Sequence, residues 1–123
     1  MTDNFSLPEF QSKDGSDFPK EVIENLKELA ENLEVLRLHL GHSIYISSGY
    51  RSLVHNAKIG GAKNSMHIKG LAADIKVSGF NPLAVFNAIE SLIESGKMKE
   101  GGLGLYRSWV HYDIRGTKAR WKK

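Results

Sequence analysis

Cysteine is missing from all 123 residues of the chain. Its absence excludes disulfide bonds and thiolate metal ligands, so any transition metal must be held by histidine and carboxylate side chains. The absence also fits synthesis in a reducing compartment such as the cytoplasm.

Long apolar runs are missing as well. The first ten residues, MTDNFSLPEF, have no basic start followed by an apolar stretch, so we expect no secretory signal peptide and a protein made in the cytoplasm. No apolar stretch approaches the roughly 18 residues that a membrane-spanning helix needs. Repeats, low-complexity tracts and linkers are also absent. With 41% hydrophobic and 25% charged residues, we expect one domain over residues 1–123.

The chain has only a small excess of positive over negative charge, with a formal net charge of +3. This small excess weakly favours an anionic partner such as nucleic acid or a cell-wall polymer. Part of it lies in residues 116–123, which read as a basic tail that is either solvated or a binding patch. An organised stripe of aromatic and basic residues is lacking, so we do not expect nucleic-acid binding.

Apolar periodicity predicts two main helices. Residues 1–18 read as an irregular arm whose apolar residues pack on the body of the domain, namely Phe5, Leu7 and Phe10. From Pro19 to Gly41, valine and leucine recur at steps of three and four and form one apolar stripe. A second helix is expected from Asn81-Pro82 to about Gly96.

The remaining segments read as strands and one long loop. SIYISSGYRS (43–52) and LAADIKV (71–77) have strand patterns, and GGLGLYRSWVHYDIRG (101–116) reads as two short strands that form a hairpin or a bent strand. NAKIGGAKNS (56–65) is rich in Gly, Asn and Lys and reads as a loop. We therefore predict a small α+β domain with a mostly antiparallel sheet packed against two main helices.

A set of polar residues lies where strands should be buried. On the last strand, Trp109, His111 and Asp113 alternate onto one face, where Trp109 is a candidate for substrate contact. A buried imidazole or carboxylate is costly without a partner. A metal would compensate if His67, Asp74 and His111 point into one cleft, since three such ligands plus water form a catalytic zinc site. The alternative is a loop histidine followed by a capping or ion-paired aspartate.

Three separated motifs resemble a known family. They are SGYRS at 48–52, SMHIKGLAAD at 65–74 and GGLGLYRSWVHYDIR at 101–115. In this order they resemble the zinc D-alanyl-D-alanine carboxypeptidases, whose relatives include phage endolysins and peptidoglycan endopeptidases. The similarity spans roughly residues 5 to 121 and implies the fold shared by Hedgehog signalling domains and DD-peptidases.

The resemblance implies a role for each matching residue. His67, Asp74 and His111 take the positions of the three ligands of one zinc ion. Arg51 takes the position of an arginine that holds the substrate's carboxylate or polarises the scissile carbonyl. Ser65 matches a serine that lines the substrate pocket.

One position departs from the family pattern. Many relatives carry a catalytic Asp or Glu three residues before the last zinc histidine, and here that position is Ser108. Asp113 is the nearest carboxylate to His111. It is either the catalytic base or a supporting acceptor for a ligand histidine or Arg51.

The resemblance implies a zinc-dependent peptidase that hydrolyses peptide bonds in peptidoglycan stem peptides through a zinc-activated water. It would be a D,D-carboxypeptidase or an endopeptidase, a monomer, and would reach the cell wall by a release like that of phage or prophage lysins. Ser108 motivates the alternative of a non-catalytic, zinc-stabilised module of the same fold that binds cell wall or a protein. The sequence does not say which bond is cleaved.

Overall fold

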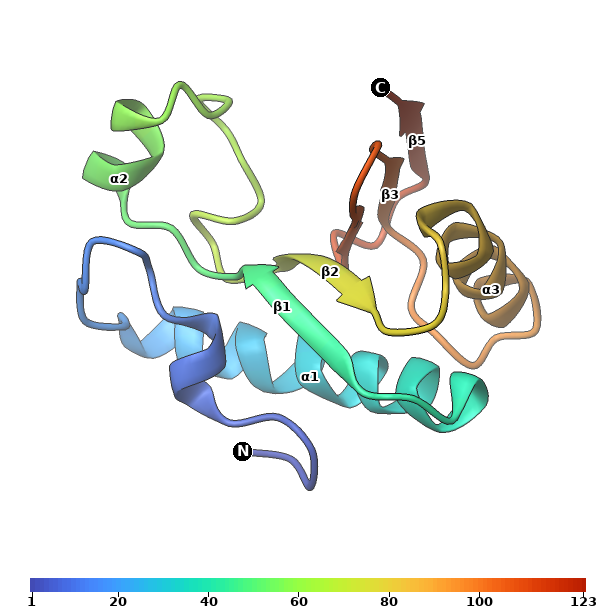
Figure 1. The fold of residues 1–123 in the computed structure, drawn as a ribbon. Helices are drawn as coiled ribbons and strands as arrows, with labels where there is room; N and C mark the ends of the chain where they lie inside the picture. The colour runs from blue at the N-terminus through green and yellow to red at the C-terminus, as the bar shows by residue number, and fades with distance from the viewer.

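The computed structural model describes residues 1–123 (Figure 1). In chain order the elements are η1 (Leu7–Phe10), α1 (Lys20–Leu40), β1 (Ile44–Ser48), α2 (Leu53–Lys58), β2 (Ala72–Val77), α3 (Pro82–Glu94), β3 (Gly102–Leu105), β4 (Val110–Asp113) and β5 (Ala119–Lys122).

The five strands form one sheet in the order β1-β2-β4-β3-β5. The pairs β1/β2, β2/β4 and β3/β4 are antiparallel, whereas β5 runs parallel to β3 at the edge. The prediction of an α+β fold with a mostly antiparallel sheet is confirmed.

The first helix matches its predicted limits. Pro19 precedes α1 as its N-cap, and Gly41 ends it in the left-handed conformation at φ 69°, with its N–H donated to the carbonyl of Arg37. The apolar stripe of α1 is buried in the core, through Val22, Leu26, Leu29, Leu33 and Leu36.

The second predicted helix is α3, which lies beside β3 in Figure 1. The Asn81 side chain accepts a hydrogen bond from the N–H of Ala84, and Pro82 follows as the first helical residue. Its apolar face joins α1 and one face of the sheet in a single core cluster. The opposite face of the sheet is left for the polar residues of β2 and β4.

The N-terminal arm packs on the body, as predicted. Phe5 and Phe10 are buried, and Leu7 is partly buried against the same core. The backbone N–H of Tyr50 donates to the carbonyl of Phe10. Gly49 allows this approach, because a Cβ there would lie 2.7 Å from the Cα of Phe10.

Two regular elements lie where the sequence analysis expected none. The segment read as a loop begins inside α2, whose N-cap Ser52 accepts the N–H of His55. Residues 116–123, read as a basic tail, contain β5, in which Arg120 binds Glu90 and Glu100. Charged residues alternate with others along this edge strand, so no apolar pattern marked it. None of the helices combines the length and the apolar character needed to cross a membrane.

Candidate metal centre

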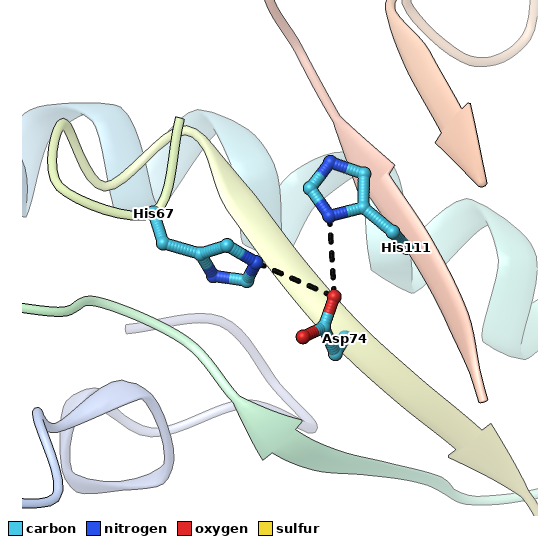
Figure 2. Close-up of side chains that lie close together, drawn as sticks. All are labelled: His67, Asp74 and His111. Carbon is cyan, nitrogen blue, oxygen red and sulfur yellow. Dashed lines mark hydrogen bonds and ion pairs between the residues drawn. The ribbon is translucent and has the colours of Figure 1, made fainter. Parts of the chain in front are cut away.

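Three buried side chains converge from three segments of the chain (Figure 2). His67 comes from the loop before β2, Asp74 from β2 and His111 from β4. Oδ1 of Asp74 lies 3.3 Å from Nε2 of His67 and 3.1 Å from Nδ1 of His111. One donor atom from each residue lies within 4.8 Å of the others, so the group could hold a metal ion.

Strand register fixes two members of this group. Asp74 on β2 pairs directly with His111 on β4, and their side chains therefore emerge side by side on one face. The third member depends on the loop. The backbone N–H of Arg51 donates to the carbonyl of His67, and the N–H of His67 donates to Oγ of Ser65.

The outer nitrogen of each histidine has a hydrogen-bond acceptor of its own. Nδ1 of His67 lies 2.7 Å from the carbonyl oxygen of Gly49, and Nε2 of His111 lies 2.7 Å from Oδ2 of Asp113. Both acceptors require a hydrogen on the histidine nitrogen. In neutral rings, the nitrogens that face Asp74 then carry lone pairs.

Two lone pairs and a carboxylate aimed at one point repel each other unless a cation lies between them. Histidines that donate their outer N–H to a carbonyl or a carboxylate are typical of metal sites. Two imidazoles and one carboxylate also form a donor set that Zn²⁺ accepts. The residues present therefore fit a zinc ion.

The close contact between Asp74 and His111 shifts the pKa of both side chains. Burial alone would raise the pKa of Asp74, but its side-chain contacts with His111 and His67 outweigh burial and hold this pKa below the ordinary value. Burial alone would lower the pKa of His111, yet its side-chain contacts with Asp113 and Asp74 raise it. The site attracts positive charge.

Asp113 lies behind His111 and is fully buried. Its Oδ1 accepts the N–H of Gly102 and Nε of Arg115, and its Oδ2 accepts Nε2 of His111 and Nη2 of Arg115. Burial would raise the pKa of Asp113, but the bonds from Arg115 and His111 lower it overall. The carboxylate thus faces the side of the His111 ring opposite to Asp74.

Arg51 lies next to Asp74. Its Nη2 is 3.4 Å from Oδ2 of Asp74, its Nε donates to Oγ of Ser48, and its Nη1 contacts Oδ1 of Asn56. The same Asn56 side chain donates to the carbonyl of Ala62 and so ties Arg51 to the loop that carries His67.

An open cleft contains the three converging residues, and the predicted Arg51, Ser65 and Trp109 line it as well. Asp113 is not among the lining residues, and the exposed Ser108 is also outside. Asp74 is the only acidic side chain that lines the cleft.

The structure adds three residues that the sequence analysis did not single out. Asn56 supports Arg51, Arg115 pairs with Asp113, and Trp121 lines the cleft. Tyr106, which reads from the sequence as a core or cleft-wall residue, lines the cleft as well. The pattern HxDxR marks Arg115 in the sequence. Nothing local marks Asn56 or Trp121, because their roles depend on partners distant in the chain.

Comparison with known proteins shows the family. The family model described as Peptidase M15 matches residues 2–113. The chain belongs to the peptidase M15 family. This confirms the resemblance drawn from the three motifs, and M15 proteins are metallopeptidases.

A curated relative is similar to part of this M15 chain. It is the probable peptidoglycan L,D-endopeptidase MepK of Haemophilus influenzae, with 37% identity over 86 residues. The alignment covers 64% of this chain and 42% of the relative, so the chain spans less than half the length of that protein.

Proposed function

We propose that this M15 chain is a zinc-dependent peptidase that hydrolyses peptide bonds in peptidoglycan stem peptides. The observation that carries the proposal is the geometry of His67, Asp74 and His111, which aim three donor atoms at one point in an open cleft. The peptidoglycan endopeptidase named among its relatives supports this substrate class. It also makes an L,D bond the first to test, with D,D-carboxypeptidase activity as the second.

His67, Asp74 and His111 would hold a zinc ion, which would supply a Lewis acid able to polarise the scissile carbonyl and acidify a water molecule. The protein supplies orientation. Arg51, held by Ser48 and Asn56, can donate guanidinium hydrogen bonds to a carboxylate or carbonyl oxygen of the substrate. Ser65 and Trp109 lie in the same cleft, and we assign both to substrate contact.

We assign Asp113 to the positioning of His111. Both of its oxygens are already engaged by His111, Arg115 and Gly102, and the carboxylate lies outside the cleft. A carboxylate in this position fixes the ring orientation of a ligand histidine and increases its basicity.

A second candidate function is a zinc-stabilised module that binds cell wall or a protein without turnover. The observation that favours it is the lack of any acidic side chain other than Asp74 in the lining of the cleft. Such a module would retain the metal and the bound peptide but release no product.

The deciding experiment measures metal content and muropeptide cleavage together. The purified protein is incubated with L,D- and D,D-linked muropeptides, with chelator, and with chelator followed by Zn²⁺. We expect mass spectrometry to show products that vanish with chelator and return with zinc. His67→Ala should remove metal and activity, while His39→Ala, at an exposed position on α1, serves as the matched control.

The outcomes separate the two functions. Zinc retention with muropeptide binding and no product would establish the binding module. A protein that neither holds zinc nor cleaves muropeptides when zinc is supplied would refute both. Monomeric state and a lysin-like route to the cell wall stay predictions.

A further inference from the structure

Three aromatic side chains form one side of the cleft, which we call the sheet wall: Tyr106, Trp109 and Trp121. The rings of Tyr106 and Trp109 are stacked, with centroids 4.6 Å apart and planes 11° from parallel. The Trp121 ring lies 5.0 Å from the ring of His111. The sheet wall therefore reaches the candidate metal centre itself.

The sheet register explains how Trp121 reaches His111 from the edge strand. Asp74 pairs with His111, His111 with Gly104, and Gly104 with Trp121, which places them in one row across four strands. A Cβ on Gly104 would lie 2.3 Å from Nε1 of Trp121. Glycine leaves the gap that the indole fills.

The indole of Trp121 has fixed neighbours on several sides. The guanidinium carbon of Arg115 lies 5.7 Å from its ring centroid, and its Nε1 donates a 2.9 Å hydrogen bond to Oη of Tyr106. An indole N–H can only donate, so Tyr106 must be the acceptor. The phenolic proton of Tyr106 is then free for another partner, and no acceptor in the chain takes it.

We propose that Tyr106 is a substrate-positioning residue whose hydroxyl donates a hydrogen bond to a carbonyl or carboxylate oxygen of the bound peptide. Trp121 sets the direction of that hydroxyl by occupying its acceptor side. This inference rests on the proposed function, because the peptide is the substrate of that reaction.

The groups at the two ends of this row define the line along which the peptide would lie. Arg51 is bonded to Ser48 and Asp74 at the β1 side, whereas the Tyr106–Trp121 pair lies at the β5 side. One hydrogen-bond donor therefore lies on each side of the candidate metal ligands: the guanidinium of Arg51 on one side and the hydroxyl of Tyr106 on the other. A peptide held by both runs across the strands, with the bond to be cleaved between its anchors.

The test is a double-mutant cycle on the cleavage of a muropeptide that the wild type hydrolyses. Tyr106→Phe removes the hydroxyl, Trp121→Phe removes the N–H while keeping an aromatic ring, and the double variant removes both. Tyr45→Phe, on an exposed tyrosine of β1, is the matched control. We expect Tyr106→Phe to raise KM about fivefold with kcat and zinc content little changed, the scale of one neutral hydrogen bond.

The cycle also tests the role of Trp121. We expect Trp121→Phe to raise KM less than Tyr106→Phe does, and the double variant to be no worse than Tyr106→Phe alone. A KM of Tyr106→Phe equal to that of Tyr45→Phe overturns the inference and leaves the peptidase function standing. Additive effects overturn the link to Trp121.

A binding measurement separates the inference from the function. If the wild type cleaves nothing, calorimetric titration with the same muropeptide compares wild type, Tyr106→Phe and Tyr45→Phe. About fivefold weaker binding by Tyr106→Phe alone supports the inference without the peptidase. Equal binding by all three, or no binding by any, overturns it. If Trp121→Phe unfolds, Tyr106→Phe alone decides.

Discussion

The two walls of the cleft are built differently. In the sheet wall, Trp121 lies on β5, and Tyr106 and Trp109 lie in the short connection between the paired strands β3 and β4, whose other face belongs to the core. The opposite loop wall, residues 60–66, has no regular helix or strand. It follows the short helix α2, where Leu53, Val54 and the C-cap residue Ile59 are exposed. It is held by local backbone hydrogen bonds, such as the one from Gly61 N–H to the carbonyl of Asn56, and by the Asn56 side chain, which donates to the carbonyl of Ala62.

This difference divides the candidate metal ligands. Asp74 and His111 are placed by strand register, which fixes their separation before any metal arrives. His67 is placed by the end of the loop wall and a few backbone bonds. We infer that the sheet provides a preformed half-site and that the loop completes it, so damage to the two walls should have different consequences.

The largest effect should come from deleting a ligand on either side. His67→Ala and His111→Ala should both abolish zinc retention and lower kcat/KM by at least about a thousandfold, since in the proposed peptidase zinc would be the Lewis acid that activates the carbonyl and the water. The two should differ in stability. His111 lies at the centre of the sheet and binds Asp113, so its loss should cost about 1–3 kcal/mol more, measured by urea unfolding in chelator. Equal urea midpoints for His67→Ala and His111→Ala would contradict the idea that the sheet provides a preformed half-site.

A smaller effect is expected behind the sheet half-site. Asp113→Asn weakens the acceptor for His111 and places an amide against Arg115, so zinc affinity should fall about 10- to 100-fold. The measurement is a competitive chelator titration, with the exposed Asp17→Asn as control. Unchanged zinc affinity with lost turnover would instead assign Asp113 to proton transfer.

A glycine on each wall allows a matched comparison of packing. In Gly104→Ala, the new Cβ would clash with the Trp121 ring. In Gly61→Ala, the new Cβ would lie 2.1 Å from Oδ1 of Asn56. The indole is confined by the sheet, whereas the buried Asn56 amide can move together with the loop wall to which it is bonded. We expect Gly104→Ala to destabilise by about 1–3 kcal/mol and to shift tryptophan fluorescence.

Gly61→Ala should cost less than about 1 kcal/mol, because the loop wall can move. Equal losses of unfolding free energy in the two alanine variants would show that the loop wall is as rigid as the sheet wall.

The most local effect should come from the Asn56 side chain that anchors the loop wall. Asn56→Ala removes the bond to Ala62 and the contact to Arg51, a loss of about 0.5–1.5 kcal/mol in the local free energy of opening. Amide hydrogen exchange should accelerate in residues 60–66 and stay unchanged in β2. The exposed Asn87→Ala on α3 controls for the substitution itself. Faster exchange in both segments would mean that the loop and sheet are not independent.

Local patterns were sufficient for the elements with a strong period or a clear stop signal. The apolar stripe of α1 ends at Gly41, and the alternation in β2 and β4 marked both strands. Local sequence patterns were insufficient to predict α2 and β5. A six-residue helix is too short for a period, and β5 is an edge strand in which Arg120 binds Glu90 and Glu100 across the fold.

By itself, the sequence determined which side chains are available for chemistry. Without cysteine, a metal site had to use histidine and carboxylate, and the alternation of β4 placed His111 and Asp113 on one face. Only the tertiary structure decided their relation: Asp74 beside His111, Asp113 behind it and Trp121 over it. The reason is that periodicity fixes the face of a strand, while the neighbours on that face depend on the register between strands distant in the chain.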